Sequence, residues 1–307
     1  MTASSTRSRY SNVAASDETP CVARGTIFRV HDYDLAATLT SGQVFRWELR
    51  DSCWEGVIGR RWVRLREDGG SITAETAEPG DDWRWLADYL QIGTSLSGVL
   101  TTFPDDEPMR AAVVACRGLR LLRQDPWECL ASFILSSTKQ IVQIRQIVAL
   151  LCERFGGPVA VPDGCRPSFA FPPPERIAQA GEDELRACKM GFRAPNLRAA
   201  ARKLAAGEVD LCRLRTMATE VARAELMRLP GVGRKIADCV LLFAYGFQDA
   251  FPVDVWVMKA LQHFYFPRRR VALQRLQKFT ASHFGPYAGY AQQYLFHYAR
   301  VHAKLKE

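Results

Sequence analysis

The pattern of apolar and polar residues changes character near residue 80. Before that point, apolar and polar positions alternate in short runs, which is the period of a strand with one buried face. In the fourth run Val63 and Leu65 alternate with two arginines, so we expect one buried face and one wet, basic face. The alternation predicts antiparallel strands at residues 26–31, 44–50, 53–59, 61–67 and 71–76.

Beyond residue 80, apolar residues recur with the 3.6-residue period of helices. Helices are predicted at residues 81–91 and 109–117, flanking the sheet, and almost everything from Asp125 onward is predicted to be helical. There Asp125 supplies an N-cap, Pro126 the first helical position and Glu128 the acid of a capping box. A proline-rich loop at residues 156–174 interrupts the helices before they resume.

These patterns predict an α+β fold. An N-terminal antiparallel sheet domain with flanking helices is expected at residues 26–117, packed on a larger all-α domain at residues 118–307. Residues 1–25 are rich in Ser, Thr, Ala and Arg and lack the apolar region of a secretory signal, so we expect a flexible tail. The longest apolar stretch, residues 240–247, is far below the length of about 20 residues that a membrane span requires.

Composition limits the function classes further. With 307 residues, of which 48% are hydrophobic, the chain has enough apolar content for one or two cored domains. Its 9 cysteines are scattered, which indicates a reducing compartment, and the histidines form no set with zinc spacing, so we expect no metal and no cofactor. The net charge of +8 favours a polyanionic partner such as DNA or RNA.

The most informative segment is residues 226–239, Leu-Met-Arg-Leu-Pro-Gly-Val-Gly-Arg-Lys-Ile-Ala-Asp-Cys, which predicts a helix, a tight turn and a second helix. Gly231 and Gly233 allow positive φ and leave room for a phosphate, which the N–H groups of the second helix can bind without reading a base. The tripeptide Pro252-Val253-Asp254 follows, with its aspartate 19 positions after Lys235.

This arrangement resembles the helix-hairpin-helix superfamily of DNA base-excision glycosylases, and the spacing resembles its bifunctional members. The resemblance implies that the neutral amine of Lys235 attacks C1′ of a nucleotide, expels the base and holds the sugar as a Schiff base before β-elimination cuts the strand. A lysine with an ordinary pKa of about 10.4 offers little neutral amine at pH 7. We therefore expect the helix N-terminus and burial beside Cys239 and Phe243 to favour the neutral form. Asp254 is expected to cap the next helix and to stabilise positive charge on the sugar.

Other segments narrow the resemblance to 8-oxoguanine DNA glycosylase/lyases, and it covers most of the chain from residue 26. It rests on residues 41–47, 118–137 and 285–296, and on Cys239, four residues after Lys235. The implied pocket uses the carbonyl of Gly42 to accept N7–H of the oxidised base, and places Gln292 on the Watson–Crick edge. Its other members would be Cys239 and Phe296, which cover the two faces of the flipped base, and Pro252. Taken singly, Gly42 is equally well a turn glycine, and Phe296 and Cys239 are equally well core residues.

The resemblance also implies contacts with DNA outside the pocket. These are phosphate contacts at Gly231, Val232 and Gly233, an aromatic wedge at Phe192 and a cytosine-reading arginine at Arg193. Three positions depart from the family pattern: Thr138 replaces an asparagine that fills the gap left by the flipped nucleotide, Gln143 an arginine that contacts the orphaned cytosine, and Trp256 a histidine that contacts phosphate.

Two other functions remain open. A monofunctional glycosylase for alkylated bases would use only the aspartate, which Lys235 argues against. A catalytically silent DNA-binding module would explain the net charge but not Gly42, Gln292 and Phe296. Relatives with a C-terminal iron–sulfur cluster are excluded because no cysteine follows Cys239. We therefore expect a monomeric DNA glycosylase/lyase acting on double-stranded DNA that contains oxidised guanine, not secreted, in the cytoplasm or nucleoid of a bacterium or the nucleus of a eukaryote.

Overall fold

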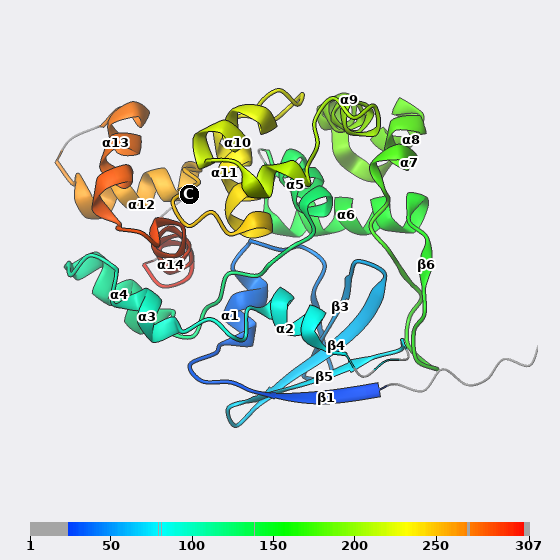
Figure 1. Cartoon of the computed structure of the whole chain (residues 1–307), viewed down its shortest axis with the longest axis horizontal. Helices are drawn as coiled ribbons and strands as arrows, with labels where there is room; N and C mark the ends of the chain where they lie inside the picture. The colour runs from blue at the N-terminus through cyan, green and yellow to red at the C-terminus, as the bar shows by residue number, and fades with distance from the viewer. Residues whose placement is uncertain (1–23, 79, 81, 138, 269–270, 304–307) are drawn as a thin grey trace, which may run out of the picture.

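The computed structural model describes residues 24–78, 80, 82–137, 139–268 and 271–303. A five-stranded antiparallel sheet lies beneath a layer of helices (Figure 1), which confirms the predicted α+β architecture. The tail predicted at residues 1–25 lies outside the described residues up to residue 23. Its last two residues, Arg24 and Gly25, belong to the first strand.

The sheet has the strand order β1-β5-β4-β3-β2. On β4, Val63 and Leu65 are fully buried, as the alternation predicts. Arg64 lies opposite Glu55 on β3 and Glu75 on β5 and forms ion pairs with both, so acids neutralise the charge expected on this face. The strands are β1 (Arg24–Arg29), β2 (Glu48–Arg50), β3 (Cys53–Ile58), β4 (Arg61–Asp68) and β5 (Ser71–Thr76).

The strand predicted at residues 44–50 is confirmed only at Glu48–Arg50. Val44 and Phe45 are buried, but they belong to an irregular segment that joins the sheet to the helices. The Gln124 side chain donates a hydrogen bond to the carbonyl of Gln43 at 2.7 Å and so occupies backbone that a sheet partner would need. The apolar residues Val44 and Phe45 therefore indicate burial and not pairing with a neighbouring strand.

Two helices form a hydrophobic core with the sheet. These are α1 (Leu35–Thr40) and α2 (Arg84–Leu90), whose leucines share a buried cluster with Leu65 and Ile72. The sequence pattern does not predict α1, although Asp34 is its N-cap and accepts the N–H of Ala37. The helix predicted at residues 81–91 is shorter at its start.

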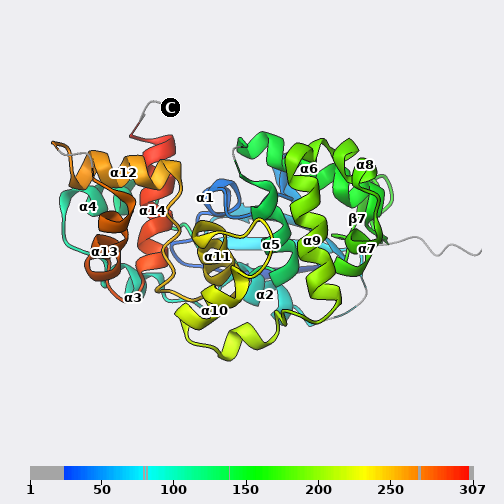
Figure 2. The ribbon, with the colours of Figure 1, turned by 90° about the horizontal axis from the view of Figure 1, so that it is seen from above.

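The helix predicted at residues 109–117 is present, but it does not flank the sheet. Helices α3 (Leu96–Leu100) and α4 (Glu107–Ala115) lie on the side of the molecule occupied by α14 (Ala288–Val301) (Figure 1; Figure 2). Met109 and Ala112 on α4 are buried in the core of the helical part. The apolar face of α4 therefore has α14 as its partner, which local periodicity does not reveal.

The remaining elements form the helical layer. Helix α5 begins after Asp125, whose carboxylate accepts the N–H of Glu128, as predicted. Among the described residues, no helix is long and apolar enough to cross a membrane. The elements are α5 (Pro126–Leu135), α6 (Ile141–Phe155), the hairpin β6 (Pro158–Val159) and β7 (Ser168–Phe169), α7 (Pro174–Gln179), α8 (Glu182–Leu185), η1 (Arg186–Met190), η2 (Gly191–Arg193), α9 (Ala194–Ala205), η3 (Arg213–Thr216), α10 (Thr219–Leu226), α11 (Arg234–Val240), η4 (Leu241–Tyr245), α12 (Val255–Tyr265) and α13 (Leu273–His283).

A buried ion pair joins the segment before β2 to α5. The guanidinium of Arg46 lies 3.2 Å from the carboxylate of Glu128, and their side chains are 9% and 15% exposed. The sequence pattern predicted that Glu128 would act as the acid of a capping box. In the structure its carboxylate pairs with Arg46. Burial raises the pKa of Glu128, and the charge of Arg46 opposes that rise. Each charge is tolerated in this water-poor place because the other is present.

We predict that Glu128→Ala lowers the free energy of unfolding by about 3–5 kcal/mol, because it leaves the charge of Arg46 buried without its carboxylate. Urea unfolding followed by circular dichroism measures this change. Asp105→Ala is the control, since Asp105 pairs with Arg110 in full exposure and its loss should leave the unfolding midpoint in place. Equal shifts of the midpoint in both variants would contradict the prediction.

Candidate active site

Lys235 and Asp254 lie at the starts of two different helices. Gly233 is the N-cap of α11, so Lys235 is in its first turn. Asp254 is the N-cap of α12, and its Oδ1 accepts the N–H of Val257 at 2.7 Å, which confirms the predicted cap. The positive end of a helix dipole favours an anion, so α12 supports the carboxylate of Asp254.

Both residues line one cavity of about 620 Å³. Its walls come from the segment after α1, from α5 and α6, from α11 and α12, and from α14, so residues more than 200 positions apart in the chain meet there. The structure brings together at this cavity the two predicted catalytic residues and every predicted pocket residue, together with Trp256. These are Lys235, Asp254, Gly42, Cys239, Pro252, Gln292, Phe296 and Trp256.

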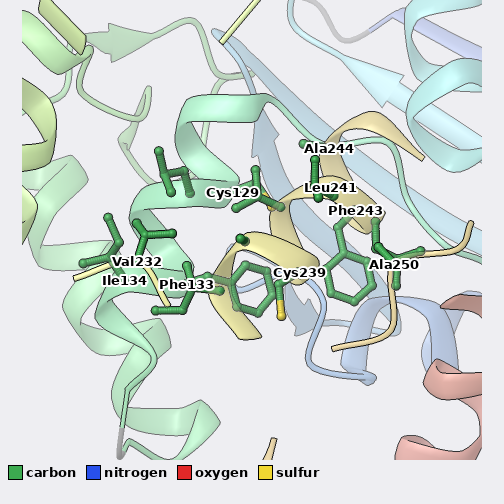
Figure 3. Close-up of a cluster of buried hydrophobic side chains, with 14 of the residues drawn as sticks. Cys129, Phe133, Ile134, Val232, Cys239, Leu241, Phe243, Ala244 and Ala250 are labelled. Carbon is green, nitrogen blue, oxygen red and sulfur yellow. The ribbon is translucent and has the colours of Figure 1, made fainter. Parts of the chain in front are cut away.

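The amine of Lys235 rests against aromatic rings and a hydroxyl. Its Nζ lies 3.4 Å from Oγ of Ser136 and 5.1 Å from the ring centre of Phe133. The ring of Phe133 stacks on that of Phe243 with centres 5.6 Å apart, and Figure 3 shows Cys239 beside both rings. The amine is therefore held at the edge of an apolar wall that faces the cavity.

The carboxylate of Asp254 is kept in a largely water-free position. Burial raises its pKa above the ordinary value, while the N–H of Val257, the charge of Lys235, the N–H of Trp256 and the charge of Arg300 oppose that rise. The anion is thus stabilised by fixed donors and cations in place of water. An anion held in this way is suited to stabilising positive charge that develops nearby.

Cys239 forms part of the apolar wall and is not a competing nucleophile. Burial raises the pKa of its thiol to about 12, so the sulfur remains protonated at neutral pH. A thiol attacks as its thiolate, which is scarce here. Beside this protonated thiol, the wall offers the amine of Lys235 as a second group that could attack a ligand.

The backbone around Gly42 is fixed by buried glutamine side chains. Gln43 is fully buried, donates to the carbonyl of Arg120 at 2.8 Å and accepts the N–H of Leu122 at 2.8 Å. From α14, Gln293 donates to the carbonyl of Ser41 at 2.9 Å. The carbonyl before Gly42 and the side chain after it are thus both bound to the helical part of the molecule.

The backbone conformation of Gly42 favours glycine. Its φ is +82°, a conformation that glycine adopts readily and other residues rarely do. A Cβ at this position would lie 3.0 Å from Cδ1 of Ile141 and 3.1 Å from Nη1 of Arg300, so these side chains would have to shift. The absence of a Cβ is consistent with a close approach of this backbone to a ligand.

Helix α14 presents polar and aromatic groups to the cavity at intervals of one turn. Gln292 is 3% exposed, and its Oε1 has no hydrogen-bond partner within the described part of the chain. Leaving a buried carbonyl oxygen unpaired costs about 1–3 kcal/mol, so a bound ligand that donates to it is favoured. Phe296 follows four residues later on the same face.

Sequence reasoning missed two arginines that line the cavity, Arg145 and Arg300. The guanidinium of Arg300 lies 5.3 Å from the ring centre of Phe296 and donates to the carbonyl of Thr40 at 3.0 Å. Burial and the neighbouring charge of Arg145 lower its pKa. A signal was available for Arg300, because it follows Phe296 by four residues and so shares its face of α14.

The helix-hairpin-helix turn lies between α10 and α11, outside the cavity lining. Gly231 has φ of +78°, whereas Gly233 has φ of −95°, so the expectation of positive φ is confirmed at one glycine and wrong at the other. The Val232 side chain is buried, and its N–H donates to the carbonyl of Leu229. The turn therefore exposes its two glycines, while Val232 anchors it to the core.

The predicted wedge is connected to Lys235 through two successive serines. Phe192 is 63% exposed, whereas Arg193 is 3% exposed, with its guanidinium 4.2 Å from the Phe192 ring centre. Arg193 donates to the carbonyl of Ser137, and Lys235 bonds to the adjacent Ser136, so two successive residues connect the wedge to the amine. Thr138, the next residue in the chain, lies outside the described residues.

Family models match nearly all of the described chain. A model of the 8-oxoguanine DNA glycosylase N-terminal domain matches residues 26–130, and one of the HhH-GPD superfamily of base excision DNA repair proteins matches residues 131–281. The chain is 31% identical over 279 residues to N-glycosylase/DNA lyase OGG1 of Arabidopsis thaliana, covering 85% of this chain and 76% of that protein. The chain belongs to the 8-oxoguanine DNA glycosylase family.

Solved structures agree with this family over the whole fold. The 8-oxoguanine glycosylase/lyase of Clostridium acetobutylicum, in complex with double-stranded DNA containing cytosine opposite 8-oxoguanine, superposes with a TM-score of 0.85 at 28% identity, covering 91% of this chain and 97% of that chain. MBOgg1 in complex with a low-affinity DNA ligand gives a TM-score of 0.86 at 33% identity, covering 94% and 98%. The family resemblance drawn from the motifs is thereby confirmed.

We predict that Gly231→Ala destabilises the chain by at least about 1–2 kcal/mol, because alanine is strained at positive φ. Its Cβ would also lie 2.9 Å from Cβ of Asn196 on α9. Thermal unfolding measures the loss. The matched control is Gly233→Ser, since this N-cap has extended backbone and open space for a side chain. A similar loss of stability in the control would show that the turn does not depend on the conformation of Gly231.

Proposed function

We propose that this chain removes 8-oxoguanine from double-stranded DNA and then cleaves the strand, acting as a DNA N-glycosylase and AP lyase. The observation that carries the proposal is a single cavity that joins the amine of Lys235 and the carboxylate of Asp254 to base-sized walls at Gly42, Gln292 and Phe296. A monofunctional alkylated-base glycosylase has no use for the amine, and a silent binding module has no use for the cavity.

In the proposed reaction, Lys235 is the nucleophile. Its neutral amine forms a bond to C1′ of the damaged nucleotide, and the bond from C1′ to the base breaks with the electron pair leaving on the base. Asp254 stabilises the positive charge that develops on the sugar as this bond breaks. Loss of a proton from the amine and opening of the sugar ring give a Schiff base, and removal of a proton from C2′ then expels the 3′ phosphate by β-elimination.

The base is proposed to be read from its edges and covered on its faces. 8-Oxoguanine carries a hydrogen on N7, where guanine has only an acceptor lone pair, so the carbonyl of Gly42 favours the lesion. The unpartnered oxygen of Gln292 accepts a donor on the Watson–Crick edge. Phe296 and Cys239 contact opposite faces of the flipped ring, with Pro252 closing the pocket.

The duplex around the lesion is proposed to contact surface groups near the cavity. The exposed backbone at Gly231 and Gly233 binds phosphate, as does Trp256 at the cavity mouth. Phe192 enters the stack beside the flipped nucleotide, Thr138 takes the position that faces the gap left by this nucleotide, and Arg193 contacts the cytosine opposite the lesion. The net charge of +8 supports binding to the phosphate backbone. We further propose that the protein acts as a monomer, at the nucleoid or in the nucleus, and that the reaction in the cavity needs no cofactor.

We predict that Lys235→Gln abolishes the covalent adduct that borohydride reduction gives with duplex DNA containing 8-oxoguanine. Reduction traps the Schiff base, and glutamine cannot form one. The adduct is measured by denaturing gel electrophoresis and its position by peptide mass spectrometry.

Lys139→Gln is the matched control, because Lys139 lines the same cavity. It should trap DNA in the same yield as the unaltered chain. If instead Lys235→Gln traps normally and Lys139→Gln does not, the nucleophile has been assigned to the wrong lysine.

We also predict that Gly42→Ala reduces the preference for duplexes containing 8-oxoguanine over guanine by at least about tenfold, because a Cβ is strained at this positive φ and would displace the carbonyl from N7–H, and a lost buried hydrogen bond costs about 1–3 kcal/mol. Competitive binding assays measure the ratio of the two Kd values. Gly59→Ala is the control, because Gly59 also has positive φ but lies in an open hairpin turn away from the cavity. An unchanged ratio for Gly42→Ala would refute the pocket assignment.

A further inference from the structure

Three side chains that commonly bind metal ions meet at the C-terminal end of α14, outside the cavity lining. Cys116, His297 and His302 each offer one ligand atom, and these atoms all lie within 4.8 Å of one another. Cys116 is the C-cap of α4, His297 is in the last turns of α14, and His302 is the C-cap of α14. The sequence analysis found no metal set because packing, and not spacing, brings the cysteine to the histidines.

The cluster contains an unsatisfied buried group. Cys116 is 2% exposed and His297 is 6% exposed. Nδ1 of His297 has no hydrogen-bond partner within the described part of the chain. Buried polar atoms are almost always paired, and an ion bound at this cluster is one way to satisfy a buried imidazole whose neighbours are a thiol and a second imidazole.

The donor set and its dimensions suit zinc. One sulfur and two imidazole nitrogens are borderline-soft ligands of the kind that zinc prefers. Bonds of about 2.3 Å to sulfur and about 2.0–2.1 Å to nitrogen place neighbouring ligand atoms about 3.3–3.6 Å apart in a tetrahedron. Since the ligand atoms lie within 4.8 Å of one another, they need to approach by at most about 1.2–1.5 Å, and His302 is exposed at the end of its helix, where its side chain can rotate.

We propose that Cys116, His297 and His302 bind a zinc ion that fastens the C-terminal end of α14 to α4. The fourth position, on the exposed side of His302, is open to water. Since Gln292 and Phe296 project from the same helix, the ion would hold in register the wall that covers the base. The proposal does not depend on the reaction assigned to the cavity.

Zinc binds cysteine as the thiolate and histidine as the neutral ring. Binding therefore replaces the S–H bond of Cys116 by a sulfur–zinc bond and transfers the proton to solvent, with no change of oxidation state.

Titration of the metal-stripped full chain with Co²⁺ alone tests the proposal. We expect one equivalent to bind, with the visible bands of tetrahedral Co²⁺ and a near-ultraviolet thiolate-to-cobalt band, and Zn²⁺ to displace it. Cys116→Ala should abolish the thiolate band. His302→Ala should weaken binding by at least about tenfold, since it removes one of three protein ligands. Cys212→Ser and His263→Ala are controls with an exposed cysteine and a histidine elsewhere, and both should bind Co²⁺ unchanged.

Thermal unfolding gives a second readout that does not depend on buried Cys116. Excess Zn²⁺ should raise Tm of the unaltered chain by several degrees and leave Tm of His302→Ala in place, because an ion that binds only the folded state stabilises it. His302 is exposed, so this variant is expected to fold normally. The proposal would be overturned if the unaltered chain showed no Co²⁺ bands. It would also be overturned if Cys116→Ala and His302→Ala gave the same Co²⁺ bands as the unaltered chain.

Discussion

An amine and a carboxylate are held at the starts of two helices that face the same cavity, and the rest of the structure depends on this placement. The glycine turn before α11 sets the position of Lys235, and the Pro-Val-Asp segment before α12 sets that of Asp254. The positive end of the α12 dipole favours the anion of Asp254. Burial then makes the carboxylate depend on fixed donors in place of water.

The cavity is a product of both parts of the chain. The sheet part supplies Gly42, and the helical part supplies everything that Gly42 faces. Buried glutamines and the Arg46–Glu128 pair bind the segment that carries Gly42 to α5, to α14 and to the irregular segment before α5. A shift of either part would move the carbonyl of Gly42 away from the wall formed by α14. The proposed recognition of the base therefore depends on a stable contact between the two parts.

The sequence predicts most of this site and a smaller share of the fold that supports it. Local signals suffice for β3, β4 and β5, for the Asp125 cap and for the hairpin at Gly231, because each rests on contacts between near neighbours. The irregular course of Val44 and Phe45 and the packing of α4 on α14 depend on distant partners. Arg145 and the cluster at Cys116 also depend on distant partners, so the local pattern does not predict them. Arg300 could have been predicted, because it follows Phe296 by one helical turn.

The central claim is that Asp254 is retained for its charge and not for its cap. Asparagine caps helices as well as aspartate does, so Asp254→Asn should fold with unchanged or higher stability. The pKa of Asp254 is raised in the folded state, so the carboxylate lowers stability as pH rises through the window above its ordinary value of 3.8, and the advantage of the variant should grow across that window. Single-turnover release of 8-oxoguanine is the decisive measurement. The account predicts a rate at least about 10²-fold lower in Asp254→Asn, and release at the unaltered rate by this stably folded variant would contradict it.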